Sequence, residues 1–415
     1  MKVHTSLRVT SLALASTFAL TGCLSSGGDD DSEGGAGGED GPITIGISLP
    51  LTGDFSEPGK GIQRGYEAWA EFTNDNGGLL GRDVELEILD DQSNADRVAS
   101  DYERLINQDE VDLVVGPFST LLVIPSAQVA QDYGFLFIEP AGAAPEVFEE
   151  GFDNLFYAAP AVANDHYNHL ADYIEAMPES ERPQTAAYAA MDDPFAQGTA
   201  YGLKDRLEGM GVETVVDEVY PPNTTDFGGI AAQIADSEAD IVVGGSQYQD
   251  GVNLILALQQ LDYQPTMAAF STAPTEAEFE KAIGGKTEGI LAPTGYTPAA
   301  EYPSNVEFVE FYTEKHGNPP GEDEANAWTT GQVLAAAVEA ADCADSALVN
   351  PECQQEMIDW LRENEVETVV GPLSWDEAGR PQSAHMIQQW IDGEIKIVLP
   401  EEQAEAEIIV EKPEW

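Results

Sequence analysis

The chain has 415 residues, with 17 Lys and Arg side chains against 76 Asp and Glu, and a formal net charge of −59 at pH 7. A chain this acidic repels the phosphates of DNA and RNA, so nucleic acid partners are excluded. The charge is spread along the sequence, which indicates a solvated surface suited to high salt, where repulsion between carboxylates is screened. We therefore expect a halophilic acidic surface.

The first residues have the pattern of a secretory signal peptide. Lys2 and Arg8 precede an apolar stretch from Leu12 to Leu20, and Thr21-Gly22-Cys23 follows. The stretch is too short for a spanning helix, and its ending is typical of a lipoprotein signal, which predicts removal of residues 1–22 and lipidation of Cys23. The alternative is an ordinary signal peptide with an incidental cysteine. Removal would leave 15 basic side chains against 76 acidic ones, a net charge of −61.

The next segment is predicted to be a tether. Residues 25–41 contain no large side chain to bury, so we expect residues 23–41 to form a disordered acidic Gly/Ser/Asp tether. The remaining residues, about 370, are too many for one hydrophobic core and fit two lobes. No later segment approaches twenty apolar residues, so no further membrane span is expected.

Strand and helix patterns alternate after the tether. An apolar run at 42–53 precedes a helical pattern from Gly61 to Gly78, and the alternation then continues. Such alternation implies parallel sheets covered by helices on both faces. Strands are expected at 84–91, 112–117, 135–142, 185–193, 214–222 and 239–246, and helices at 94–108, 125–134, 198–211, 226–238 and 251–264.

The two series of strands predict an α/β fold with two doubly wound parallel-sheet lobes of similar build. Later segments at 287–296, 326–341 and 368–379 must be shared between the lobes. No Pro/Gly/Ser-rich linker separates the lobes, which indicates short hinges between them.

Two strand ends offer a candidate ligand site. Ser119 and Thr120 follow the apolar run 112–117 and lie near the start of the next helix. In open α/β sheets, ligands bind beyond the carboxyl ends of the strands, where unpaired backbone N–H groups favour a carboxylate or a polar carbonyl. The alternative is that the two hydroxyls only cap the helix. The neighbouring strand end, Ala141-Gly142-Ala143, exposes backbone in a similar way and favours a site.

Aromatic residues also follow several predicted strands. Phe55, Phe118, Phe195, Tyr248 and Tyr296 all lie just past such a strand. Each alone is compatible with simple packing. Gathered around one cleft, they would form an apolar pocket with few polar groups, which suits a small organic ligand.

Other chemistry has less support. The glycines from Gly59 to Gly65 do not have the G-x-G-x-x-G spacing and lie too far from the preceding strand for a dinucleotide fold. His166 and His169 lie three residues apart on a predicted helix, but no third metal ligand stands out. No nucleophile pairs with a base. We expect no enzyme, no cofactor and no metal.

Two cysteines remain after Cys23. Cys343 and Cys353 flank a nine-residue gap that contains Asn350-Pro351, which predicts a local disulfide in an exported protein. Zinc would require two more ligands nearby, and the segment contains no histidine.

These segments together resemble a known family. The chain from Ile43 to about Val398 is similar to type I periplasmic-binding proteins of the branched-chain amino acid and amide importers, most of all to the leucine/isoleucine/valine-binding group. The motifs that carry the resemblance are ITIGISLPLTG, NDNGGLLGR, VVGPFST, FLFIEPAGAAPEV, DDPFAQG, DFGGIAAQI, VVGGSQYQDG, EGILAP, TVVGPLSWDEAG and QQWIDGE.

The resemblance implies two lobes joined by a three-strand hinge that close on a ligand. The first lobe would contain 42–156 plus 272–370 and the second 157–271 plus 371–400, with 401–415 as an acidic C-terminal tail. Crossings are expected near Phe156, Ser271 and Gly371.

The resemblance also implies ligand contacts. The loops Phe118-Ser119-Thr120 and Ala141-Gly142-Ala143 would hold the ligand's α-carboxylate and part of its ammonium. Phe195 would cover the ligand from the second lobe. The acid that binds the ammonium would lie in the turn 245–250.

Two positions depart from the family pattern. Ala143 stands where relatives carry a hydroxyl, and the acidic anchor aligns with Gln249, with Asp250 one residue late. An ammonium against a neutral amide loses a charge-assisted hydrogen bond, on the order of 1.5–3 kcal/mol. Either Asp250 takes this role or the ligand has no free ammonium, so a neutral amide, a carboxylic acid or an aromatic acid fits comparably well.

The sequence thus predicts an extracytoplasmic solute-binding lipoprotein, anchored to the cell membrane through Cys23. It would deliver a small organic ligand to the permease and ATPase subunits of an ABC importer. The alternative is a ligand-sensing receptor domain that serves a separate membrane signalling partner. A gene neighbourhood that contains permease and ATPase genes would distinguish the two.

Overall fold

The computed structural model describes residues 41–415 except 262, 277, 342 and 344–347. The predicted signal peptide, the tether up to residue 40 and the predicted lipidation of Cys23 lie outside the described residues. Among the described helices, none has both the length and the apolar character to cross a membrane.

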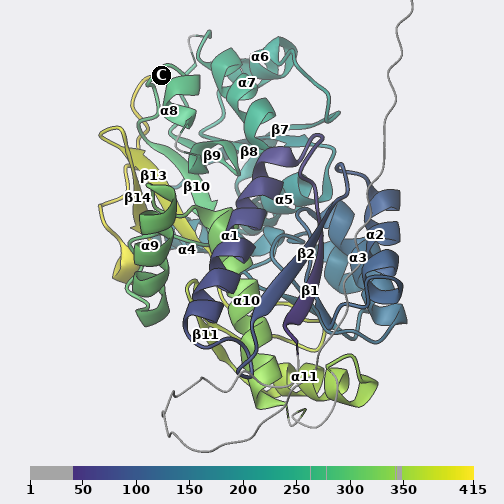
Figure 1. Cartoon of the computed structure of the whole chain (residues 1–415). Coiled ribbons are helices and arrows are strands. Elements are labelled where there is room, and N and C mark those ends of the chain that lie inside the picture. Colours follow the sequence, from purple (N-terminus) through teal and green to yellow (C-terminus); the bar gives the residue numbers. More distant parts are fainter. Residues whose placement is uncertain (1–40, 262, 277, 342, 344–347) are drawn as a thin grey trace, which may run out of the picture. The chain divides into compact units, whose positions relative to one another are not determined.

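The first sheet is built on a fully buried parallel strand. β1 (Ile43–Leu49) pairs in parallel with β2 (Val84–Asp90) on one side and with β3 (Leu113–Val114) on the other (Figure 1). Its isoleucines have almost no exposure, as expected for a strand that is covered on both faces. A parallel bridge from Val115 to Ile138 continues the sheet towards the parallel pair β4 (Phe137–Glu139) and β5 (Leu155–Tyr157).

Helices cover both faces of this first sheet. One face packs against α1 (Ser56–Asp75) and α10 (Glu322–Ala340), and the other against α2 (Ala95–Asn107) and α3 (Thr120–Asp132). Helix α1 lies very close to α10 at Gly65, where a Cβ atom would be 2.4 Å from the carbonyl oxygen of Glu324. A larger residue would separate the two helices. Two further helices of this region are α9 (Pro303–His316) and α11 (Pro351–Glu363).

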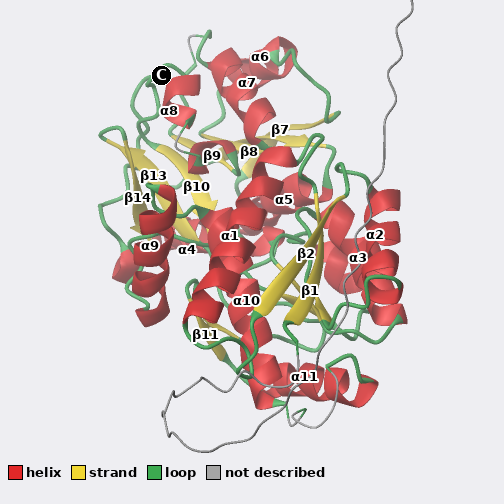
Figure 2. Ribbon diagram, viewed as in Figure 1, coloured by secondary structure: helices red, strands yellow, loops and turns green. Residues whose placement is uncertain are grey.

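The second sheet has seven strands in the order β14-β13-β10-β9-β8-β6-β7 (Figure 2). The five strands from β6 to β10 are parallel, whereas β13 pairs antiparallel with both β10 and β14. Their bounds are β6 (Thr185–Met191), β7 (Glu213–Tyr220), β8 (Ile241–Gly245), β9 (Met267–Phe270), β10 (Ile290–Thr294), β13 (Met386–Ile391) and β14 (Glu394–Leu399).

This sheet is also covered on both faces. Apolar side chains from α4 (Asn168–Ala176) and α5 (Pro194–Gly209) pack in one core cluster, and those of α6 (Gly228–Ser237) and α7 (Tyr248–Leu258) pack in another. The predicted α/β fold with two parallel-dominated sheets is confirmed. The short elements are α8 (Phe279–Ala282), the hairpin β11 (Val366–Thr368) and β12 (Gly371–Leu373), and four 3-10 turns at Pro145–Glu149, Ala163–Asp165, Ala273–Thr275 and Glu401–Gln403.

The lobe limits remain a prediction, but the strand pairing differs from them at β10. Residues 272–370 are expected in the first lobe, whereas β10 pairs with β9 and β13 of the seven-stranded sheet. All five residues of β10 are buried. A short apolar run is compatible with a buried strand in either sheet. The sequence of β10 therefore does not indicate which sheet the strand joins.

The start of α3 also differs from the prediction. The sequence predicts this helix over residues 125–134. It begins five residues earlier, at Thr120, and Pro125 lies inside it. The helix therefore starts directly at the candidate ligand loop.

Residues 401–415 are packed rather than a free acidic tail. Buried Gln389 on β13 donates from Nε2 to the carbonyl of Ile409 at 2.9 Å and accepts from the N–H of Ile409 at 2.7 Å. Ile408 and Val410 pack on one core cluster of the seven-stranded sheet, and Trp415 packs on the other. The sequence signal for this packing was the apolar run 408–410, which lies between Glu407 and Glu411.

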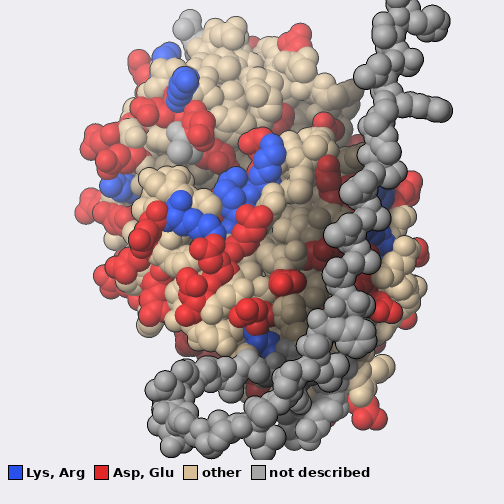
Figure 3. Space-filling view, in the orientation of Figure 1, with Lys and Arg blue, Asp and Glu red and all other residues tan. Residues whose placement is uncertain are grey.

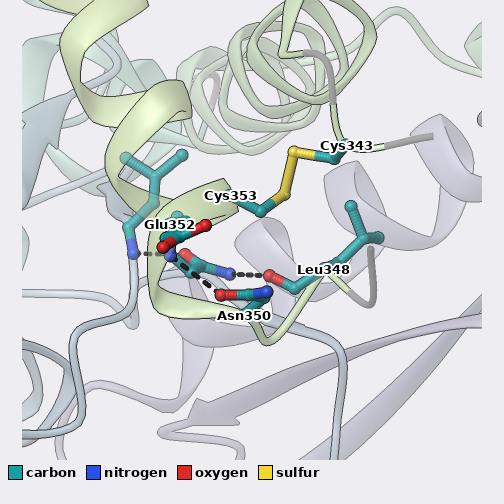
Figure 4. Close-up of a disulfide and its surroundings, with 7 residues drawn as sticks. Cys343, Leu348, Asn350, Glu352 and Cys353 are labelled. Carbon is teal, nitrogen blue, oxygen red and sulfur yellow. Dashed lines mark hydrogen bonds between the residues drawn. A yellow bond between two sulfur atoms is a disulfide. The ribbon is translucent and has the colours of Figure 1, made fainter. Parts of the chain in front are cut away.

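The predicted disulfide is present. Cys343 and Cys353 are bonded, with Cα atoms 5.5 Å apart, and both side chains are buried. Figure 4 shows the bond beside the start of α11, where Asn350 Oδ1 accepts from the N–H of Glu352 at 3.0 Å. The disulfide thus holds the start of α11 in the core of the first sheet.

Candidate functional site

The loop before α3 has an unusual backbone at Ser119. This residue is the N-cap of α3, with φ at +75°, and its side chain makes no capping hydrogen bond. Left-handed φ values are costly for residues with a Cβ atom and cluster at functional sites. Ser119 Oγ is buried and has no hydrogen-bond partner among the described residues. These features do not support the capping interpretation, and they favour a contact to a ligand.

Thr120 joins the two candidate loops. Its side chain is buried, and Oγ1 accepts a hydrogen bond from the N–H of Ala144 at 3.3 Å. The carboxyl ends of β3 and β4 therefore lie side by side, as expected for neighbouring parallel strands.

The second loop contains an acid that the sequence interpretation missed. Glu139, the last residue of β4, is fully buried and accepts from the N–H groups of Ala141 at 2.7 Å and Gly142 at 2.5 Å. Burial raises the pKa of Glu139 to about 8, against the opposing effect of these two hydrogen bonds. An acid at the end of the apolar run FLFIE was the available signal.

Ala143 and Phe195 lie together. Ala143 belongs to a small buried cluster with Tyr157 and Ala163, and the half-buried ring of Phe195 packs against this cluster. Phe195 also makes an edge contact with the ring of His166, with centroids 5.8 Å apart. The structure thus brings the predicted covering ring next to the second loop.

Phe55 and Phe118 form a second aromatic contact. Their ring centroids are 6.0 Å apart, and both side chains are half-buried. Phe55 stands at the start of α1, where its N–H donates to Ser93 Oγ at 3.1 Å. Because Phe118 directly precedes Ser119 in the chain, this aromatic pair forms an apolar border to the loop.

Of the two candidates for the acidic anchor, Asp250 is the buried one. Gln249 is exposed, and its Nε2 donates to Asn253 of the same helix at 3.1 Å. Asp250 is 5% exposed and accepts from the hydroxyl of Tyr220 at 2.6 Å. Burial raises the pKa of Asp250 to about 6, although the Tyr220 hydrogen bond opposes this shift.

Tyr296 is not brought to these loops by any observed contact. Its hydroxyl donates to Asn305 Oδ1 at 2.9 Å, and its ring packs near Phe308 of α9. The side chain is buried in the core of the first sheet. The simple packing alternative therefore describes it better than a ligand contact.

Two surface hollows are lined by residues that neighbour the predicted ones in the chain, such as Gln197 after Phe195 and Gly295 before Tyr296. One, of about 400 Å³, is lined by polar residues of α4 and α5 such as Asn168 and Arg206. The other, of about 170 Å³, lies by Pro160, Gly295 and Met386. Among the described residues, no three His, Cys, Asp or Glu side chains are arranged to hold a metal ion. The ligand contacts remain a prediction that rests on the loops at β3, β4 and β8.

Comparison with known proteins gives the family. The sequence profile of a family described as "Periplasmic binding protein" matches residues 42–394. An amino acid binding protein of Pseudomonas aeruginosa is 26% identical over 354 residues, which cover 84% of this chain and 90% of that protein.

Two solved structures share the fold. A leucine binding protein of Thermotoga maritima matches with a TM-score of 0.72 and 21% identity, over 86% of this chain and 97% of that one. A solute binding protein of an ABC transporter from R. palustris, in complex with benzoate, matches with a TM-score of 0.72 and 19% identity, over 86% and 96% of the two chains. As the resemblance of its motifs indicated, the chain belongs to the periplasmic binding protein family, whose members bind solutes outside the cytoplasm and are not enzymes.

Proposed function

We propose that the protein captures a small organic ligand, an amino acid, an amide or a related carboxylate, between its two lobes and delivers it to the permease of an ABC importer. Family membership supports capture without chemical conversion. The names of similar proteins, which include an amino acid binding protein and a benzoate complex, support a ligand of this size.

The observation that carries the proposal is the junction of the two loops. Thr120 Oγ1 accepts from the N–H of Ala144, while Ser119 keeps a buried hydroxyl without a partner among the described residues. A buried hydroxyl without a partner costs free energy that a ligand can recover. The ligand would be held from the first sheet by this junction and covered from the second by Phe195 and the start of α7, so binding would select the closed form.

The anchoring proposal rests on sequence alone. The apolar stretch that ends at Thr21-Gly22-Cys23 supports a lipid on Cys23 that holds the protein at the outer side of the membrane. The test is metabolic labelling with palmitate. The label should be incorporated into the wild-type chain and not into a Cys23→Ala variant.

A Thr120→Ala variant is expected to bind ligand about tenfold more weakly, because it loses the hydroxyl that joins the two loops, a change of about 1–1.5 kcal/mol. A thermal-shift screen of amino acids, amides and aromatic acids first supplies a ligand. Calorimetry then measures its affinity for both proteins, and X-ray scattering measures whether the wild-type particle becomes more compact on binding.

Thr120→Ser is the matched control, because it keeps the hydroxyl and should keep most of the affinity. Equal affinity of the alanine and wild-type proteins would exclude the predicted site. A particle whose dimensions do not change with any bound ligand would argue against capture between the lobes.

Acidity is proposed to reflect a saline habitat, and stability should therefore rise with salt. Figure 3 shows Asp and Glu side chains spread across the visible face with few Lys and Arg among them. Because the Debye length falls from about 10 Å at 0.1 M to about 3 Å at 1 M, repulsion between these carboxylates should weaken. We expect Tm to rise by several degrees, roughly 2–4 °C per kcal/mol, between 0.1 and 2 M NaCl.

Sucrose at matched osmolality serves as the control, because it stabilises proteins by exclusion without screening charge. An equal rise of Tm in sucrose and in NaCl would remove the support for a halophilic surface.

A further inference from the structure

Three segments of the chain connect the two sheets, and they meet at Gly295. The first runs from β5 to α4, the second leaves β10 at Gly295, and the third runs from Trp375 in the core of the first sheet to β13. A Cβ atom on Gly295 would lie 3.1 Å from Cδ of Pro160 in the first segment and 3.0 Å from Nε2 of His385 in the third. All three connections are therefore in contact at one place.

Two buried histidines stack on each other at this place. His166 lies at the end of the first segment, just before α4, and His385 lies just before β13. Their ring centroids are 3.9 Å apart, and the ring planes are inclined by 20°. His166 is 5% exposed and His385 is 2% exposed. The stack therefore joins two of the connecting segments through side chains that water barely reaches.

The surroundings of the two rings fit neutral imidazoles. Nε2 of His166 lies 3.2 Å from the carbonyl oxygen of Ala161, which can only accept, so Nε2 carries the proton. Nε2 of His385 lies 3.6 Å from Oε1 of Glu322, and Nδ1 of His385 is buried without a hydrogen-bond partner among the described residues. A proton added to that Nδ1 would have no acceptor in this arrangement.

Glu322 lets the stack carry one charge but not two. It lies in the first turn of α10, and its carboxylate accepts from Oγ1 of Thr294 at 3.0 Å and from the N–H of Gly295 at 3.2 Å. The same carboxylate faces His385 and would stabilise a charge on that ring. A second charge, on His166, would lie directly against the first. Burial and then His385 accordingly lower the pKa of His166 well below its ordinary value.

Other charged groups from the elements around the stack have partners of their own. Asp165 precedes His166 and lies 3.5 Å from Nη2 of Arg380, which belongs to the third connecting segment. Asp193 caps its own helix, α5. His169 of α4 is half-buried and lines the smaller surface hollow. The two acids are thus poorly placed to neutralise a cation on His166.

The stack supports two parts of the candidate site. The ring of Phe195 makes its edge contact with His166, with centroids 5.8 Å apart. The N–H of Ala163, three residues before His166, donates to the carbonyl of Ala143 in the second loop at 2.7 Å. A shift of His166 would therefore disturb both the predicted covering ring and the second loop.

We propose that the stack of His166 and His385 is a proton-sensitive joint between the two sheets, which holds Phe195 in place while at most one ring is charged and loosens when both are charged. This inference rests on the proposed function, because Phe195 is expected to cover the ligand. His166 would act on the ligand through Phe195, as a positioning residue.

The direction of the pH effect follows from the lowered pKa of His166, which is caused by burial and by His385. A histidine released from the stack has a pKa near its ordinary value of about 6.5. Below that pH the loosened form binds a proton that the stacked form refuses, so acid favours the loosened form. The joint should be intact above about pH 6.5 and should weaken progressively as the pH falls.

Amide hydrogen exchange on the ligand-free mature chain tests the joint. Protection of the N–H of Ala163, corrected for intrinsic exchange, should fall about tenfold in the wild type from pH 7.5 to pH 5. His166→Phe and His385→Phe each keep a ring in the stack but remove one of the two charges, so protection should fall about twofold or less in each. His169→Phe is the matched control and should behave as the wild type.

Two results would overturn the joint: equal protection at both pH values in the wild type, or an equal fall in the wild type and in both stack variants. A ligand from the thermal-shift screen that binds and compacts the particle, while protection of Ala163 does not depend on pH, would leave the proposed function standing and remove the joint. If protection falls as expected but no amino acid, amide or aromatic acid binds, the joint stands and the proposed function fails.

Discussion

Replacing Glu139 with glutamine is expected to stabilise the protein above pH 8, by on the order of several kcal/mol. Burial raises the pKa of this carboxyl to about 8 in the folded protein, against about 4.3 in an unfolded chain. Between these values the folded state binds the proton that the unfolded state has lost. The contribution of Glu139 to stability is therefore largest at low pH and declines as the pH rises from about 4.3 to 8.

The measurement is the free energy of unfolding in urea at pH values from 4.5 to 9. Glutamine keeps an oxygen that can accept from the N–H groups of Ala141 and Gly142, and it cannot ionise. The free energy of unfolding of the Glu139→Gln variant should therefore change less with pH than that of the wild type. Glu149→Gln removes an exposed carboxylate from the turn that follows the same loop and corrects for the loss of net charge. If the free energy of unfolding has the same pH dependence in the Glu139→Gln and Glu149→Gln variants, Glu139 is not the group that titrates.

Loss of the disulfide is expected to lower the free energy of unfolding by about 2–3 kcal/mol. The bonded cysteines are 10 residues apart, and opening a loop of this length restores that much entropy to the unfolded chain. The folded state should retain α11, because buried Gln354 next to Cys353 accepts from the N–H of Leu136 at 2.7 Å and donates to the carbonyl of Leu348 at 2.8 Å.

Urea unfolding of the wild type, with and without dithiothreitol, gives the size of this effect. The double variant Cys343→Ala and Cys353→Ala should match the reduced wild type and should not respond to the reductant. If oxidised and reduced wild type unfold at the same urea concentration, the bond contributes nothing to stability.

The alternation of strands and helices was predictable from sequence because it depends on local patterns. Ile43, Ile45 and Ile47 lie in a run whose period and branching are typical of a buried strand. The partner of a strand depends on distant residues instead. β10 and the antiparallel pair of β13 and β14 therefore could not be placed in a sheet from their own residues.

The candidate site was predictable where backbone position decides it. Ser119 and Thr120 follow from their place after an apolar strand, and the motifs that resemble the family identified the same loop and the family itself. The roles of Glu139 and Asp250 depend on their burial and on the partners that surround them. In a chain with 76 acidic residues, the composition does not distinguish such acids from the solvated majority, and for Glu139 the one local signal was its place at the end of the apolar run FLFIE.

The packing of residues 405–415 has a consequence for export. The N–H of Glu405 donates to Ile397 of β14 at 2.8 Å, and that of Lys412 donates to Thr266 next to β9 at 2.8 Å. Residues that pack on the seven-stranded sheet are thus synthesised long after the first strand of that sheet. If the chain is exported as proposed, it must stay extended in the translocation pore, and the second core then cannot be completed before residues 405–415 have also emerged.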